Sequence, residues 1–181
     1  MAYKIVKGAY DAWMKKNSFQ LPSPMTKDKK VLVANHGQGG RRCGSRLKEG
    51  KNVAFLTLGD PTVYSTYLYV HKRIVERGYE AEIVSGITSF CAVAARLNMG
   101  LVEMAEPLHV IPATYNADTM DDILKLPGTK VLMKTGKKLK QVRESILESG
   151  QAAVMIEDCG MPTEKYMSAQ RTYRNSPDII P

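Results

Sequence analysis

The chain has 181 residues, of which 44% are hydrophobic and 24% charged, which is typical of a soluble globular protein with one domain or two small ones. The net charge of +8 comes from residues 1–51, which carry 12 Lys and Arg against 3 Asp and Glu. This excess of positive charge indicates either an anionic partner or a solvated lysine-rich surface, and we favour the solvated surface. Three scattered cysteines (Cys43, Cys91 and Cys159) and three scattered histidines argue against a disulfide scaffold and a metal site, and they predict a reducing, cytoplasmic setting. No membrane span is expected, because no apolar run approaches about 18 residues. No signal peptide is expected either, because residues 1–16 carry the charged side chains of Lys4, Lys7, Asp11, Lys15 and Lys16.

The first part of the chain predicts a helix followed by irregular structure. Apolar residues recur at helical spacing over residues 2–16, which indicates an amphipathic helix. In the segment Gly37–Ser45, four glycines within eight residues predict a basic loop rather than a helix. Its glycine spacing resembles a P-loop or a dinucleotide-binding loop, but Ser45-Arg46 replaces Lys-Ser/Thr in the first pattern and Arg42 replaces the third glycine in the second. We therefore favour a disordered basic loop over a phosphate cradle.

The central feature of the sequence is the stretch from Val53 to Ser65. Residues Val53–Leu58 are mostly apolar and predict a buried strand, Gly59 permits a tight turn, and Thr62–Arg77 has helical periodicity. Open α/β sheets bind their ligands at such strand-to-helix turns. An ordinary connection between a strand and a helix remains an equal alternative at this point.

The rest of the chain continues the alternation of strands and helices. A strand at Tyr79–Val84 leads to a second glycine turn, Ser85–Ser89, and a helix at Phe90–Leu97 for which Thr88 is a candidate N-cap. Further strands are predicted at Leu108–Ile111, Lys130–Lys134 and Ala152–Glu157, and helices at Asp118–Lys125 and Leu139–Ser149. This order predicts an α/β protein with a largely parallel sheet. We place one domain at residues 1–111, a linker at 112–115 and a second domain at 116–181, with a loose tail over residues 168–181.

Four stretches in order resemble motifs of the tetrapyrrole methylases, the S-adenosylmethionine (SAM) enzymes of cobalamin and sirohaem synthesis. They are Phe55–Ser65, Ile83–Phe90 (in which Ser85 stands where proline is usual), Val131–Gly136 and Ala153–Gly160. The resemblance is greatest to the branch that methylates C(20) of precorrin-2 or cobalt-factor II. It implies a two-domain fold, with a largely parallel sheet in the first domain and a mixed sheet in the second, and SAM bound in the cleft between them. It also implies a cytoplasmic homodimer that binds neither nucleic acid nor membrane.

The resemblance also implies the residues of the site. The SAM-binding set is Gly59, Asp60, Val63, Thr88, Ser89, Thr135 and Cys159. Lys134 and Lys137 are candidates for pairing with the carboxylates of a tetrapyrrole. No residue is identified as a catalytic base.

Three departures from the family pattern lead to further expectations. Met1 falls inside the family's first domain, beyond its first strand and glycine-rich loop, and the family's last strand would follow Pro181. Residues 37–46 differ from the family's charged helix, and we predict that they are not a native functional loop. We therefore expect the 181-residue polypeptide alone to be poorly soluble or partner-dependent, and inactive as a methyltransferase. The alternatives are a catalytically silent fold remnant or dimerisation module and, least favoured, a nucleic-acid binder that uses the basic residues 1–51.

Overall fold

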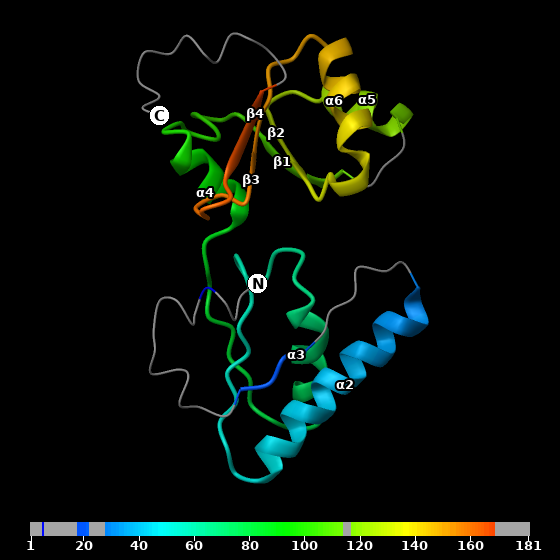
Figure 1. Ribbon diagram of the computed structural model, residues 1–181, viewed down its shortest axis with the longest axis vertical. Helices are drawn as coiled ribbons and strands as arrows, with labels where there is room; N and C mark the ends of the chain where they lie inside the picture. The colour runs from blue at the N-terminus through cyan, green and yellow to red at the C-terminus, as the bar shows by residue number, and fades with distance from the viewer. Residues whose placement is uncertain (1–4, 6–17, 22–27, 114–116, 169–181) are drawn as a thin grey trace. The chain divides into compact units, whose positions relative to one another are not determined.

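The computed structural model describes residue 5 and residues 18–21, 28–113 and 117–168 (Figure 1). Contacts between Cα atoms divide the chain into two compact units, Met1–Thr88 (unit 1) and Ser89–Pro181 (unit 2). The helix predicted at residues 2–16 lies outside the described residues except for Ile5, which is helical, and so does the tail after Ser168. The predicted linker at 112–115 is described only at its first two residues, and the domain boundaries stay a prediction.

Unit 1 is built around two helices, α2 (Lys29–Lys48) and α3 (Tyr67–Val75), which lie side by side (Figure 1). The prediction of a loop at Gly37–Ser45 is wrong, because α2 runs through it. Asp28 caps the N-terminus of α2 by accepting hydrogen bonds from the backbone N–H groups of Lys30 and Val31. The glycines cost helix propensity, about 1 kcal/mol each relative to alanine. All four are buried, however, and Gly37, Gly39 and Gly40 face side chains of α3; a Cβ atom at Gly39 would lie 3.1 Å from the Cγ2 atom of Val70. Their small size therefore allows the two helices to pack closely.

The core of unit 1 consists of Cys43, Val70 and Ile74, against which the side chains of Val53 and Phe55 pack. The strands predicted at Val53–Leu58 and Tyr79–Val84 are not formed, because neither segment has a ladder partner among the described residues. Over residues 53–58 the half-buried and exposed positions alternate, as they do in an extended chain with one covered face. The predicted helix Thr62–Arg77 is confirmed over its central part, as α3.

Unit 2 has the α/β order that the sequence predicts. Its elements are α4 (Ser89–Arg96), β1 (Leu108–Pro112), α5 (Ala117–Lys125), β2 (Thr129–Met133), the 3₁₀ turn η2 (Gly136–Lys138), α6 (Leu139–Glu148), β3 (Val154–Glu157) and β4 (Lys165–Ser168). Strands β1 and β2 pair in parallel with Val110 opposite Val131, and β3 and β4 pair antiparallel with Ile156 opposite Tyr166. The predicted α/β fold is confirmed. β4 was missed, because its four residues are all exposed and show no apolar alternation.

The core of unit 2 lies where α5 and α6 pack against β2. Ala113 is fully buried there, with Met120 and Leu124 from α5 and Val142 and Ile146 from α6, and Leu132 of β2 packs against them. Helix α5 has its apolar residues on one face, as expected for a helix that covers a sheet. Within the described residues, no helix is long and apolar enough to cross a bilayer, and no group of three or more His, Cys, Asp or Glu residues gathers as it would around a metal ion.

Candidate functional site

Two segments of unit 1 are joined by the side chain of Asp60: the turn Gly59–Val63 and the stretch Ser85–Thr88, which the sequence predicted as a second turn but which is irregular in the structure. One carboxylate oxygen of Asp60 accepts hydrogen bonds from the backbone N–H and the hydroxyl of Thr62 within its own turn. The other oxygen accepts from the hydroxyl of Ser85 at 2.8 Å and from the backbone N–H of Gly86 at 3.0 Å. Asp60 is 8% exposed, so a buried carboxylate holds the two turns together.

The protonation of Asp60 reflects these four donors. The hydroxyl and the backbone N–H of Thr62, then the hydroxyl of Ser85 and the N–H of Gly86, hold the pKa of the Asp60 carboxyl far below its usual value. Asp60 is therefore an anion at neutral pH, and its oxygens are already engaged within the chain. Asp60 thus holds two segments of the chain together, and its contact with a cofactor stays a prediction.

Two glycines allow the turns to approach each other. Gly59 has a φ of +70°, in the left-handed region, as its predicted role in a tight turn requires. A Cβ atom at Gly86 would lie 2.4 Å from the carbonyl oxygen of Gly59 and 3.1 Å from its carbonyl carbon, closer than atoms can pack. Only glycine fits at position 86 with the turns at this separation.

The other predicted residues of these turns have different environments. Val63 is half-buried, and its backbone N–H donates to the carbonyl oxygen of Asp60 at 3.2 Å. Ser89 is exposed and is the first residue of α4. The prediction that Thr88 caps α4 is wrong, because its hydroxyl oxygen is buried and has no hydrogen-bond partner among the described residues. Such a group is costly unless something else satisfies it, and therefore calls for an explanation.

In unit 2, the predicted residues after β2 form a tight connection to α6. Lys134 is exposed and has a φ of +61°, and Thr135 follows it, half-buried, at the start of η2. Lys137 lies within η2, and its side chain is outside the described part of the structure. Lys134 and Thr135 thus stand at the carboxyl end of a parallel strand, the edge where α/β sheets bind ligands.

The turn at Asp158–Cys159 connects β3 to β4 and is held by Glu164. One carboxylate oxygen of Glu164 accepts from the backbone N–H of Gly160 at 2.6 Å, and the other accepts from Nε of Arg96 on α4 at 2.9 Å. These bonds, with one from the Tyr166 hydroxyl, lower the pKa of Glu164. Burial and then the negative charge of Glu164 raise the pKa of the Cys159 thiol, so the thiol is protonated at neutral pH.

The structure brings Gly59, Asp60 and Val63 together with the segment Ser85–Thr88. It does not pair β3 with β2, so ladder hydrogen bonds do not place Cys159 beside Thr135. Sequence reasoning missed the positioning roles of Ser85, Gly86 and Glu164. Ser85 carried a signal, because it stands where the family usually has proline, and proline could not donate a side-chain hydrogen bond to Asp60.

Comparison with known proteins shows matches over most of the chain. A family model described as Tetrapyrrole (Corrin/Porphyrin) Methylases matches residues 3–171. A probable cobalt-precorrin-2 C(20)-methyltransferase of Methanocaldococcus jannaschii is 42% identical over 135 residues, which are 75% of this chain and 55% of the relative. The cobalt-precorrin-2 C(20)-methyltransferase of Salmonella typhimurium is 30% identical over 144 residues, which are 78% of this chain and 60% of the relative. The chain thus spans just over half the length of these relatives.

The fold also resembles a solved structure. The X-ray structure of the cobalt precorrin-4 methyltransferase CbiF matches with a TM-score of 0.57 and 20% identity, over 81% of this chain and 62% of that one. At this identity the match supports the fold alone.

Proposed function

Since this chain belongs to the tetrapyrrole (corrin/porphyrin) methylases, we propose that it carries out, or forms part of an enzyme that carries out, SAM-dependent methylation of C(20) of precorrin-2 or cobalt-factor II in cobalamin biosynthesis. The names of the relatives support the substrate and the methylated position. The single structural observation that carries the proposal is that Asp60 joins the Gly59 turn to the glycine-containing segment Ser85–Thr88.

The turns of unit 1 have features that suit binding of SAM. Gly59 has no side chain, so a ligand can approach the main chain closely there, whereas the space beside Gly86 is filled by the carbonyl group of Gly59. The buried hydroxyl of Thr88 lacks a partner in the described structure and could bond to a polar group of the cofactor. Gly59, Val63 and Thr88 are thus the proposed contacts in unit 1, and Asp60 holds them in place. Ser89, Thr135 and Cys159 are proposed contacts from unit 2.

Methyl transfer from SAM requires that the protein orient the reactants more than that it supply a strong acid or base. SAM supplies an electrophilic methyl group on a sulfonium, whose positive charge is dispersed as the methyl is transferred. The residues of this chain would fix the donor, align the acceptor carbon and exclude water. Lys134 and Lys137 are the proposed partners for the carboxylates of the tetrapyrrole, through charge-assisted hydrogen bonds. A homodimer, a cytoplasmic location and the absence of nucleic-acid or membrane binding are proposed with the function, and sedimentation velocity tests the first of these.

Calorimetry with S-adenosylhomocysteine tests the function directly. Binding in the micromolar range is expected, because the methionine and adenosine parts of this product are those of SAM. No heat of binding at millimolar ligand would refute the proposal and favour a catalytically silent fold remnant or dimerisation module. A methylation assay with precorrin-2 then separates binding from turnover, and it tests the expectation that the 181-residue chain alone is inactive.

A further inference from the structure

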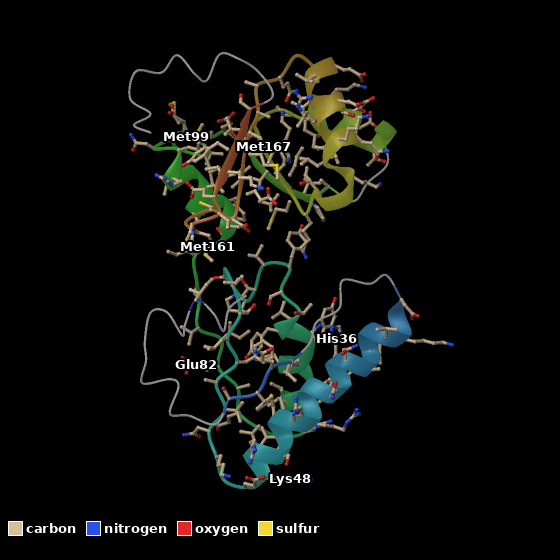
Figure 2. The ribbon with its side chains drawn as sticks, in the orientation of Figure 1. His36, Lys48, Glu82, Met99, Met161 and Met167 are labelled. Carbon is tan, nitrogen blue, oxygen red and sulfur yellow. The ribbon has the colours of Figure 1, made fainter. Side chains whose placement is uncertain are left out.

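Unit 1 has an open hollow of about 800 Å³ at the C-terminal ends of α2 and α3. Residues from the last two turns of α2 and from its C-cap line it together with two residues that follow α3. The lining residues are Arg41, Gly44, Ser45, Lys48, Glu49, Arg77 and Tyr79. Lys48 marks this end of α2 in Figure 2. The volume lies within the range of sites that bind small molecules, about 300–1,000 Å³.

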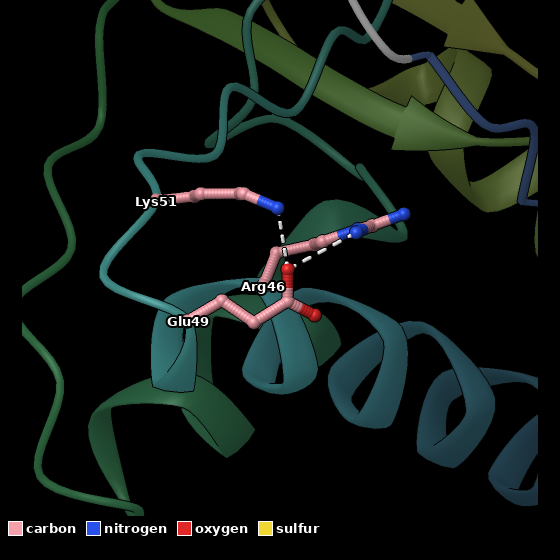
Figure 3. Close-up of polar contacts among 3 residues, drawn as sticks. All are labelled: Arg46, Glu49 and Lys51. Atoms are coloured by element: carbon pink, nitrogen blue, oxygen red, sulfur yellow. Dashed lines mark hydrogen bonds and ion pairs between the residues drawn. The ribbon is translucent and has the colours of Figure 1, made fainter.

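The charge that faces the hollow is positive. Arg41 and Lys48 are exposed, and among the described residues neither forms an ion pair with a carboxylate. The one acidic lining residue, Glu49, is engaged elsewhere: Nη1 of Arg46 lies 3.2 Å from its Oε2 atom, and Nζ of Lys51 bonds to the same oxygen (Figure 3). These two cations lower the pKa of Glu49 and offset its charge. Three cations, those of Arg41, Lys48 and Arg77, are thus left facing the hollow.

One of these cations is held in position by the glycines of α2. Nη1 of Arg77 donates to the carbonyl oxygen of Gly40 at 2.6 Å, and it lies 3.1 Å from where a Cβ atom of Gly44 would be. The guanidinium therefore lies across the glycine face of α2, and within the described part of the chain its hydrogen bond to Gly40 leaves other N–H groups for a ligand. A fixed arginine fork loses less side-chain entropy on binding an anion than a mobile one.

The hollow is separate from the turns that hold Asp60. Helix α3 has nine residues and therefore spans about 13 Å; it begins shortly after the first turn and ends just before Arg77. The hollow is not a P-loop either, because the backbone N–H groups of the glycines in residues 37–44 lie within helix α2. Contact with an anion would come from side chains. The C-terminal ends of two helices carry partial negative charges of about half a unit each, which three full positive charges outweigh.

We propose that this hollow binds a small phosphate-bearing anion. The guanidinium groups of Arg41 and Arg77 present donors that match phosphate oxygens, Lys48 adds a third cation, and the hydroxyls of Ser45 and Tyr79 add neutral donors. Nothing in the proposed methyl transfer uses these residues.

The test is calorimetry of the whole 181-residue chain with pyrophosphate and tripolyphosphate at low ionic strength. Wild type is expected to bind in the micromolar range. Arg41→Gln and Lys48→Gln should each weaken binding about tenfold, since each removes a charge-assisted contact, and Glu49→Gln should strengthen it. Lys72→Gln is the matched control, because it removes the same charge from an exposed position of α3 that does not line the hollow. Adenosine diphosphate compared with pyrophosphate shows whether phosphate alone is recognised or a nucleotide.

Two results would overturn the proposal. One is the absence of binding by wild type at millimolar tripolyphosphate. The other is an equal loss of affinity in Lys72→Gln and in the two hollow variants, because binding would then follow the overall charge of unit 1. Circular dichroism of each variant checks that α2 is still folded.

Discussion

Replacing Gly86 with alanine should separate the Gly59 turn from the segment Ser85–Thr88. The added Cβ atom would lie 2.4 Å from the carbonyl oxygen of Gly59, whereas ordinary contacts begin at 3.4 Å, so the turns must move apart by about 1 Å. The 3.0 Å hydrogen bond from the Gly86 N–H to Asp60 would then lengthen to about 4 Å, beyond bonding distance. The clash is with backbone, which cannot rotate away as a flexible side chain would.

The expected cost is that of overpacking, about 1–3 kcal/mol. For a unit of this size, that lowers the midpoint of thermal unfolding by roughly 5–20 °C. The assays are thermal unfolding followed by circular dichroism, amide exchange at Gly86, and calorimetry with S-adenosylhomocysteine. We expect faster exchange and an affinity reduced at least tenfold.

A matched variant separates the turns from general destabilisation. Gly78→Ala has open space around its Cβ atom but a φ of +82°, so it strains the backbone at the other end of α3. It should lower the stability of unit 1 while leaving affinity unchanged. If Gly86→Ala kept both its unfolding midpoint and its affinity, the close approach of the two turns in the native protein would be refuted.

Three further changes test other parts of the structure. Gly37→Ala, where a Cβ atom meets only flexible arginine side chains at 3.4 Å or more, should stabilise unit 1 by about 0.5–1 kcal/mol through helix propensity, whereas a loop at this position would gain nothing in helical circular dichroism. The pKa of Asp60 is lowered in the folded protein, so the ionised carboxylate stabilises the fold fully above about pH 4, and this stabilisation is lost as the pH falls further. Asp60→Asn should therefore make the free energy of unfolding depend less on pH in the acid range. An unchanged dependence would contradict the hydrogen bonds described. Glu164→Gln removes a negative charge that raises the pKa of Cys159, so Cys159 should be alkylated faster at pH 8. Mass spectrometry measures its rate of alkylation relative to that of the exposed Cys91. If the ratio of the two rates is the same in the variant and in wild type, Glu164 has no influence on the thiol.

The sequence predicted unit 2 more fully than unit 1, for a physical reason. Strands β1 and β2 are adjacent in the sheet and separated by one helix, so local periodicity and the short connections were enough to identify them. The segments Val53–Leu58 and Tyr79–Val84 have strand-like composition, but a strand forms only with a ladder partner, and composition does not supply one. The glycine-rich part of α2 was mispredicted because propensity is a local quantity, whereas its helical state depends on packing against α3.

The location of the candidate site stays a prediction, and the hydrogen bonds of its residues could not be predicted from the sequence. The glycine and proline residues correctly predicted the turn at Gly59, whereas the turn predicted at Ser85–Ser89 is not formed. That Asp60 bonds to Ser85 and Gly86, 25 and 26 residues further along the chain, depends on the tertiary structure and has no local signature. Likewise, the contact of Glu164 with Arg96 spans 68 residues and could not be derived from spacing.

Substitution of Thr88 tests most directly whether a residue of the candidate site stabilises the fold or binds a ligand. Its hydroxyl oxygen is buried and has no partner among the described residues, which costs about 1–3 kcal/mol if nothing else satisfies it. Valine has nearly the same shape without the hydroxyl, so Thr88→Val should leave the ligand-free protein as stable as wild type or more stable. If the hydroxyl meets the cofactor, the same variant should bind S-adenosylhomocysteine about tenfold more weakly. Thr88→Ser keeps the hydroxyl and should retain affinity. A loss of stability in Thr88→Val with unchanged affinity would instead show that the hydroxyl has a partner within the protein, and would remove Thr88 from the proposed site.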